Sequence, residues 1–227
     1  MKILMIGDVV GSPGRKILKR ELPRLKRELS LGAVIVNAEN CAAGSGITAA
    51  LAKEIFEAGA DAITLGDHAW GQKEFPGQAD SVDSLVRPVN IPTECPGKGW
   101  RIITMPTFRF AVVNALGRVF MNPADCPFKA IDRALSEIPK DIPVFVDFHA
   151  EATYVNANAY LQMVRTYFNR DSELNYLIYF YTIPVPRTPV SRYVRAHFCP
   201  YVRVNYDIPI YAPVNDKFWR VIVQWGQ

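Results

Sequence analysis

Polar residues of the kinds that bind metals occur at four points where apolar segments of the chain end. They are Asp8, Glu39 with Asn40, Asp67 with His68, and His149. Carboxylates, an amide and imidazoles are the ligands that a hydrolytic Mn, Fe or Zn centre uses. A single Asp after a strand more often caps a helix or turn, and a single His more often packs or lies at the surface. Four such ends together favour one shared site, because ligands gather beyond the carboxyl ends of strands in α/β sheets.

The two histidines of this set suggest different roles. His149 directly follows the predicted strand 143–148, where a fixed imidazole would be a good metal ligand. His68 follows Asp67, so a metal on Asp67 would hold His68 beside the site without needing to bind it. That position favours His68 as a general acid that protonates a leaving alkoxide, a role that depends on nearby anions to keep the imidazole charged.

Short apolar segments alternate with amphipathic ones over the first 153 residues. The predicted strands are 2–6, 33–36, 62–65, 101–104, 110–114 and 143–148, and the predicted helices begin at Ser12 or cover 48–58 and 127–138. The strands 101–104 and 110–114 are close enough in sequence to form a hairpin. This alternation predicts an α/β layered fold around one central core.

The first predicted helix carries its own start signal and a proline that could interrupt it. Ser12 is expected as its N-cap, with Pro13 at the first helical position. Pro23 is expected to kink or split the helix. The helix is rich in Lys and Arg, which favours a solvated face over an anion-binding patch.

The overall composition is that of an ordinary globular protein. The 227 residues are 49% hydrophobic and 21% charged, which argues against disorder. No apolar run reaches the length of a membrane span. The four cysteines lack CxxC spacing, which favours reduced thiols in a cytoplasmic protein. The sequence does not determine the oligomeric state, and a homo-oligomer is compatible with it.

The composition changes abruptly near residue 153. All ten tyrosines lie after Thr153, and 13 of the 14 glycines lie before it. The whole net charge of +4 comes from the last 74 residues, which contain eight basic and four acidic side chains. In this tail, 157–168 could be a helix, and 177–185 and 218–225 have the composition of strands. We expect a core over 1–153 and a divergent tail over 154–227 that contains no recognisable domain.

Seven motifs of the first 153 residues resemble, in order, those of the YmdB-type branch of the calcineurin-like metallophosphoesterases. They are GDVVGSPGR (7–15), NAEN (37–40), GADAITLGDHAW (59–70), RPVNIP (87–92), PGKG (96–99), LGRVF (116–120) and DFHAEAT (147–153). The resemblance implies an αββα sandwich around a site for two divalent metal ions, iron or manganese. It also implies hydrolysis of phosphodiesters such as 2′,3′-cyclic nucleotides.

The resemblance further implies a role for each candidate residue. Asp8 would bind the first metal with the help of Asn40, and Glu39 would bridge both metals. Asp67 and His149 would bind the second metal. His68 would be the proton donor.

The sequence departs from the family pattern in two places. The family usually has Asn where this chain has Asp67, and the extra negative charge leads us to expect metal binding with reduced turnover. The family also continues after HAEAT with a Gly-Thr-His-Thr-His segment that supplies two more ligands, and this chain has no such segment. A reading-frame change near codon 153 would explain the switch, as would a diverged or fused C-terminus or an exchange of ligands. A frameshifted tail would leave apolar surface exposed and the fold marginal.

The sequence leaves three functions open. The first is a two-metal phosphodiesterase. The second is an impaired or inactive relic that binds one metal or none, so enzymatic activity stays open. The third is a nucleic-acid-binding module that would use the Arg and Tyr residues of the tail. The scattered arrangement of these residues argues against this third function.

Overall fold

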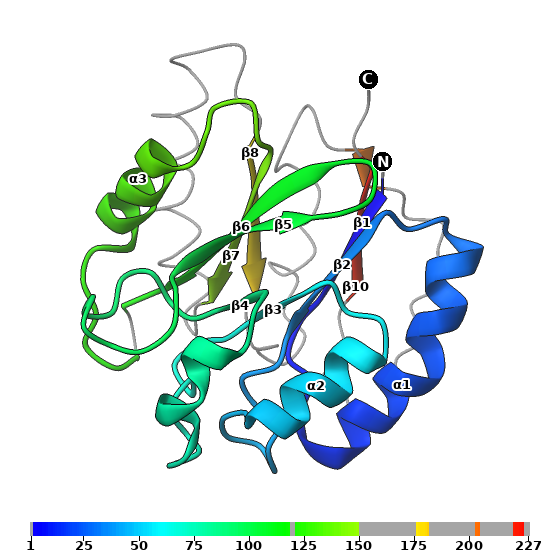
Figure 1. Ribbon diagram of the computed structural model, residues 1–227, viewed down its shortest axis with the longest axis horizontal. Coiled ribbons are helices and arrows are strands. Elements are labelled where there is room, and N and C mark those ends of the chain that lie inside the picture. The colour runs from blue at the N-terminus through cyan, green and yellow to red at the C-terminus, as the bar shows by residue number, and fades with distance from the viewer. Residues whose placement is uncertain (1, 119–120, 150–175, 182–202, 205–219, 225–227) are drawn as a thin grey trace, which may run out of the picture.

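Two β-sheets lie face to face between helices in a computed structural model of the chain (Figure 1). The structure describes residues 2–118, 121–149, 176–181, 203–204 and 220–224. The described elements are, in chain order, β1 (Lys2–Ile6), α1 (Gly11–Glu28), β2 (Ala33–Asn37), α2 (Ala49–Glu57), β3 (Ala62–Thr64), η1 (Phe75–Gly77), η2 (Ala79–Ser81), β4 (Leu85–Val86), β5 (Trp100–Thr104), β6 (Arg109–Leu116), α3 (Pro127–Glu137), β7 (Val144–His149), β8 (Tyr176–Tyr181), β9 (Arg203–Val204) and β10 (Arg220–Gln224).

The first sheet has the strand order β4-β3-β2-β1-β10-β9. Strands β1 to β4 are parallel to one another, and β10 joins β1 on its other side in the antiparallel direction. Parallel strands covered on both faces are expected to be apolar throughout, as the β1 sequence KILMI and the β2 sequence AVIVN largely are. The carboxyl ends of β1, β2 and β3 therefore meet at one edge of this sheet.

The second sheet has the order β5-β6-β7-β8. Strands β5 and β6 form an antiparallel pair, whereas β6, β7 and β8 run parallel. The predicted hairpin of 101–104 and 110–114 is thus confirmed, with Met105 N donating to the Phe108 carbonyl in the turn.

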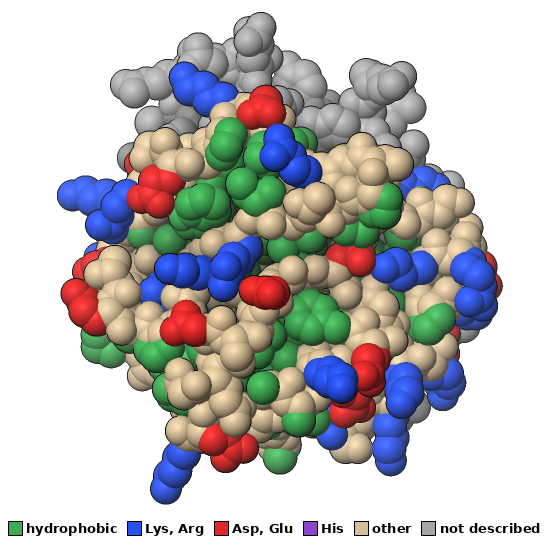
Figure 2. Space-filling model, viewed as in Figure 1, with side chains coloured by type: hydrophobic (Ala, Val, Ile, Leu, Met, Phe, Trp, Pro, Cys, Tyr) green, Lys and Arg blue, Asp and Glu red, His purple; other side chains and the backbone are tan. Residues whose placement is uncertain are grey.

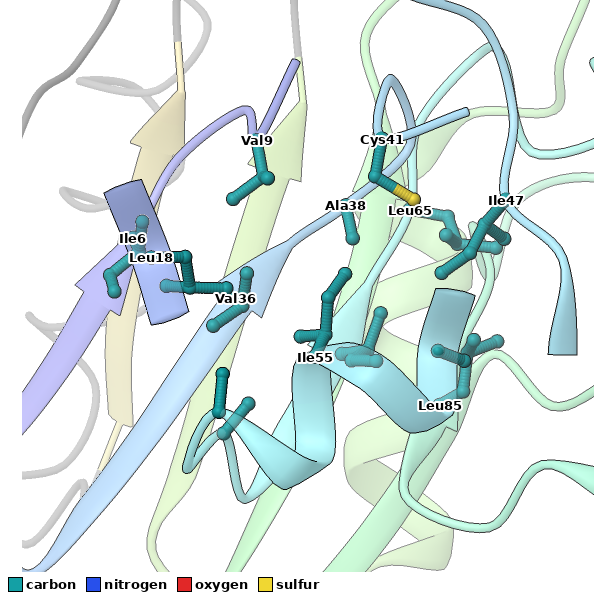
Figure 3. Close-up of a cluster of buried hydrophobic side chains, with 14 of the residues drawn as sticks. Ile6, Val9, Leu18, Val36, Ala38, Cys41, Ile47, Ile55, Leu65 and Leu85 are labelled. Carbon is teal, nitrogen blue, oxygen red and sulfur yellow. The ribbon is translucent and has the colours of Figure 1, made fainter. Parts of the chain in front are cut away.

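Three apolar clusters separate four layers, which confirms the αββα sandwich. Strand residues alternate between clusters, as the period of two requires. Leu4 and Ile6 of β1 face α1 and α2, in the cluster that Figure 3 shows in part. Ile3 and Met5 face the other way, into the layer between the two sheets. A third cluster joins the outer face of the second sheet to α3.

Helix α1 differs in detail from its sequence-based prediction. It begins at Gly11, its N-cap is Val10, and no side chain caps it, so the prediction of Ser12 as N-cap is wrong. Helix α1 is one continuous helix with Pro23 inside it, so Pro23 does not split it. Arg24 pairs with Glu21 and Glu28, as expected of a solvated helix face.

Figure 2 shows basic and acidic side chains interspersed over the viewed surface, without a large patch of one sign. Among the helices that the structure describes, none combines the length and the apolar character of a membrane-spanning segment.

Most other predicted elements are confirmed to within two residues. Helix α2 is capped by Thr48, whose side chain accepts a hydrogen bond from Leu51 N. Strand β4 was not expected from the sequence, because two residues carry no periodicity. In the tail, β8 overlaps the predicted strand 177–185 and β10 lies within the predicted strand 218–225, while the predicted helix 157–168 lies outside the described residues.

Candidate metal centre

The structure brings all six predicted side chains together at the carboxyl ends of strands from both sheets. Three of the four chain segments belong to the first sheet and follow β1, β2 and β3. The fourth, ending in His149, belongs to the second sheet. His149 is the last residue of β7 rather than the residue after a strand, which corrects its predicted position.

Three ligand atoms of this group lie close enough to share one metal ion. His149 Nε2 lies 3.1 Å from Glu39 Oε1 and 3.1 Å from Asp67 Oδ1. One ligand atom from each of the three residues lies within 4.8 Å of the other two. The side chains of His149 and Glu39 are 2% exposed and that of Asp67 is 15% exposed. Two carboxylates and an imidazole in this geometry fit a divalent transition metal.

Asn40 connects this group to Asp8. Its Nδ2 donates to Asp8 Oδ1 at 2.8 Å and to Glu39 Oε1 at 3.0 Å. Its Oδ1 lies 2.7 Å from His68 Nδ1. Because an amide oxygen can only accept, His68 Nδ1 carries the hydrogen of this contact.

His68 is the most accessible member of the group, with a side chain 46% exposed. Its backbone N donates to Glu39 Oε2 at 3.1 Å, which fixes the loop after β3 against the centre. Its Nε2 lies 3.8 Å from Asp67 Oδ2. An imidazole held on one nitrogen and open to solvent can exchange a proton with a bound molecule.

The backbone at Asp8 adopts a conformation that is uncommon outside glycine. Its φ is +47°, in the left-handed region. The following residues are held by hydrogen bonds from Val9 N to the Asn37 carbonyl at 3.0 Å and from Gly11 N to the Asn40 carbonyl at 2.9 Å. Strained residues that the surroundings fix in this way cluster at functional sites, which agrees with a binding role for Asp8.

Gly66 leaves the space that Glu39 occupies. A Cβ at position 66 would lie 2.1 Å from Glu39 Oε2 and 2.8 Å from His149 Cδ2. No side chain larger than hydrogen therefore fits there without displacing the carboxylate. The sequence did not predict a role for Gly66. Its only signal in the sequence is its position directly before Asp67.

The charges of the group hold a proton on His149. Burial by itself would lower the pKa of His149, but its contacts with Asp67 and Glu39 outweigh burial and raise that pKa well above its ordinary value. The hydrogen bond with His149 in turn lowers the pKa of Asp67. The proton on Nε2 faces both carboxylates, which is the position where a metal cation would replace it.

Two further polar residues, also absent from the predictions, lie behind the centre. Asp147 and Asn37 are buried between the sheets, and Asn37 Nδ2 donates to Asp147 Oδ2 at 3.1 Å. Burial raises the pKa of Asp147 against the opposing effects of the Thr64 hydroxyl, His149 and Asn37. Their only signal in the sequence is a spacing of two residues before Glu39 and His149.

Comparison with known proteins identifies a family and several relatives. The family described as YmdB-like protein matches residues 4–161. A 2′,3′-cyclic-nucleotide 2′-phosphodiesterase of Bacillus subtilis is 46% identical over 154 residues, which are 67% of this chain and 58% of that protein. The chain spans between 56% and 58% of the length of the curated relatives that it matches.

Solved structures of similar proteins have the same fold. A hypothetical protein from Thermus thermophilus matches with a TM-score of 0.69 and 33% identity, over 83% of this chain and 72% of that chain. A structure described as a novel phosphatase from Mycoplasma pneumoniae matches with a TM-score of 0.66 and 33% identity, over 73% of this chain and 60% of that chain.

Proposed function

The chain belongs to the YmdB-like family, and on this premise we propose that it is a metal-dependent phosphodiesterase acting on phosphodiesters such as 2′,3′-cyclic nucleotides. The convergence of Glu39, Asp67 and His149 from two sheets carries the proposal, since it offers two carboxylates and an imidazole to one ion. The name of the Bacillus subtilis relative supports the choice of substrate.

Each residue has a proposed part in the binding of two divalent metal ions, iron or manganese. Asp8 and Asn40 would hold the first metal, Asp67 and His149 would hold the second, and Glu39 would contribute to both. Metals bound there would polarise the phosphoryl oxygens and activate a water for in-line attack.

His68 is the proposed proton donor. It lies at the exposed rim of the group, and its Nδ1 is held by Asn40. Its Nε2 is therefore the nitrogen that can carry a proton to a leaving alkoxide. Asp67 Oδ2 lies 3.8 Å from this nitrogen.

A second candidate is a catalytically impaired or inactive relic of the family that binds at most one metal. Among the described residues, one group of three His, Cys, Asp and Glu side chains could hold a metal, and it serves a single ion. The absence of a His-x-His segment from the sequence favours this candidate as well. Two-metal catalysis needs sufficient ligands on both ions.

Metal analysis together with an activity assay separates the candidates. The protein would be purified from medium supplemented with Mn and Fe, and its metal content per chain would be determined. Hydrolysis of bis-p-nitrophenyl phosphate and of 2′,3′-cyclic AMP would be measured beside the His68→Ala variant. Two metals with hydrolysis that His68→Ala abolishes would support the phosphodiesterase. One metal or none, without hydrolysis, would support the relic.

A further inference from the structure

A hydrogen-bonded polar cluster lies in the otherwise apolar layer between the two sheets. Asn37 of β2, Asn114 of β6 and Asp147 of β7 are each at most 2% exposed. Their neighbours in this layer include Ile35 and Phe145. Burying polar groups is costly unless they are hydrogen-bonded, so such a cluster calls for an explanation.

Asn37 uses both its donor and its acceptor atoms in this cluster. Its Nδ2 donates to Asp147 Oδ2 at 3.1 Å and to the Leu65 carbonyl at 3.0 Å. Its Oδ1 accepts from Glu39 N at 3.3 Å. One amide thus joins the end of β2, the segment after β3 and strand β7 of the other sheet.

The contact between Asn37 and Asp147 lies directly behind the contact between Glu39 and His149. Residues two apart on a strand project from the same face, so Asp147 and His149 both point from β7 toward the first sheet. Asn37 likewise precedes Glu39 by two residues, although Glu39 lies beyond the end of β2. The pair behind joins the two sheets by a hydrogen bond, and the pair in front supplies two of the three converging ligand atoms.

Apolar packing alone would not fix the distance between those ligands. Strands β2 and β7 belong to different sheets, so no ladder of backbone hydrogen bonds joins them, and the apolar layer between them is non-directional. A hydrogen bond has a defined length and angle, and it can therefore set how β2 and β7 lie relative to each other. Asn114 supports the acceptor, because its Nδ2 lies 3.4 Å from Asp147 Oδ2 and donates to the Asp147 carbonyl at 3.2 Å.

We propose that Asn37 and Asp147 are positioning residues that lock β2 to β7 and so set the separation of Glu39 and His149. This inference rests on the proposed metal centre for its importance, but the separation itself exists with or without metal. Groups behind metal ligands commonly change affinity about 10- to 100-fold when they are removed.

The test compares Asn37→Ala and Asp147→Ala with Ile35→Ala. Ile35 lies on the same strand and the same face as Asn37, and it is fully buried, so its truncation measures the effect of a cavity alone. Mn²⁺ affinity would be measured by titration calorimetry at a temperature where circular dichroism shows each variant folded. We expect Asn37→Ala and Asp147→Ala to weaken binding at least about tenfold, and Ile35→Ala to leave it nearly unchanged.

Two further variants keep the test decisive. Asp147→Asn retains an oxygen that can accept from Asn37, and it should recover much of the affinity that Asp147→Ala loses. If Asn37→Ala does not fold, Asn37→Ser replaces it, because the shorter hydroxyl cannot reach both Leu65 and Asp147. Equal affinities of the Asn37 variant and Ile35→Ala, or no recovery by Asp147→Asn, would overturn the proposal.

A metal-free measurement separates failure of this inference from failure of the proposed function. The chain has three histidines, so the imidazole resonances can be assigned by substitution. At one fixed pH in EDTA, Asn37→Ala should shift the His149 resonances and Ile35→Ala should not. If the wild type binds neither Mn²⁺ nor Fe²⁺, the proposed function fails and these resonances still decide the inference.

Discussion

Asp67 lies close to both histidines of the candidate centre. Its Oδ1 is 3.1 Å from His149 Nε2, and its Oδ2 is 3.8 Å from His68 Nε2. As a carboxylate it helps to hold a proton on His149, because its hydrogen bond is among the interactions that raise the pKa of that imidazole. A metal ion must displace this proton from His149. The carboxylate of Asp67 therefore attracts the metal cation, and it also strengthens the binding of the proton that competes with the metal.

Asp67→Asn should therefore change how metal affinity depends on pH. In the wild type, the His149 pKa is raised, so the proton competes up to a higher pH and Mn²⁺ affinity should rise about tenfold per pH unit below that pKa. In Asp67→Asn the His149 pKa falls, and the rise should level off at a lower pH. Calorimetric titrations between about pH 6 and pH 8 would measure both curves.

The control for this experiment is Asp141→Asn, which removes an exposed carboxylate outside the centre. Asp141 has a side chain 74% exposed and lies 3.8 Å from Arg109. Its curve should follow that of the wild type. If Mn²⁺ affinity depends on pH in the same way in the wild type, Asp67→Asn and Asp141→Asn, Asp67 does not control the proton on His149.

Gly66→Ala should damage the centre without a change of charge. The added Cβ would lie 2.1 Å from Glu39 Oε2, so the carboxylate must move away from its contact with His149. We expect Mn²⁺ affinity to fall by at least about tenfold. Gly77→Ala is the matched control, because a Cβ there meets nothing within 4 Å. Unchanged affinity in Gly66→Ala would mean that Glu39 has another position from which it binds equally well.

At the scale of elements, the sequence predicts strands well where they are buried on both faces. The strand 2–6 has the predicted bounds because Lys2 and Gly7 flank an unbroken apolar run. The carboxyl ends of such strands share an edge, so the six site residues could be predicted to converge. Gly66, Asn37 and Asp147 could not be predicted in the same way. Their roles depend on which atoms meet across the two sheets, and no local pattern encodes that.

Helix α1 offers a test of local energetics away from the centre. Pro23 is exposed and lies inside the helix, where it has no N–H to donate to the carbonyl of Lys19. Pro23→Ala should stabilise the protein by about 1 to 3 kcal/mol, after allowing for the greater freedom of the unfolded chain. Urea denaturation would measure the free energy of unfolding. Lys16→Ala, also exposed on α1, should change it by less than about 0.5 kcal/mol, and an equal effect of both variants would contradict the prediction.

At the scale of the whole molecule, the break near residue 153 divides the composition but not the sheets. Strand β10 pairs with β1 on the side opposite β2, and β8 extends the second sheet beside β7. Figure 1 shows β10 alongside β1, although more than 200 residues of sequence separate them. A frameshifted tail is expected to leave apolar surface exposed, and the two strands described here lie where they cover the edges of β1 and β7. Without them, β1 and β7 would become edge strands, which invite association with other chains.

Hydrogen exchange on the full chain and on a chain ending at residue 153 would test whether the tail strands complete the sheets. If they do, the amides of β1 and β7 should be as protected in the full chain as those of β2 and β6, which are interior strands in both chains. In the shorter chain, exchange should become faster in β1 and β7 relative to β2 and β6, and the protein should self-associate. Equal protection of β1 and β7 in the two chains would instead make residues 1–153 a self-sufficient domain, because its edges would then need no strand from the tail.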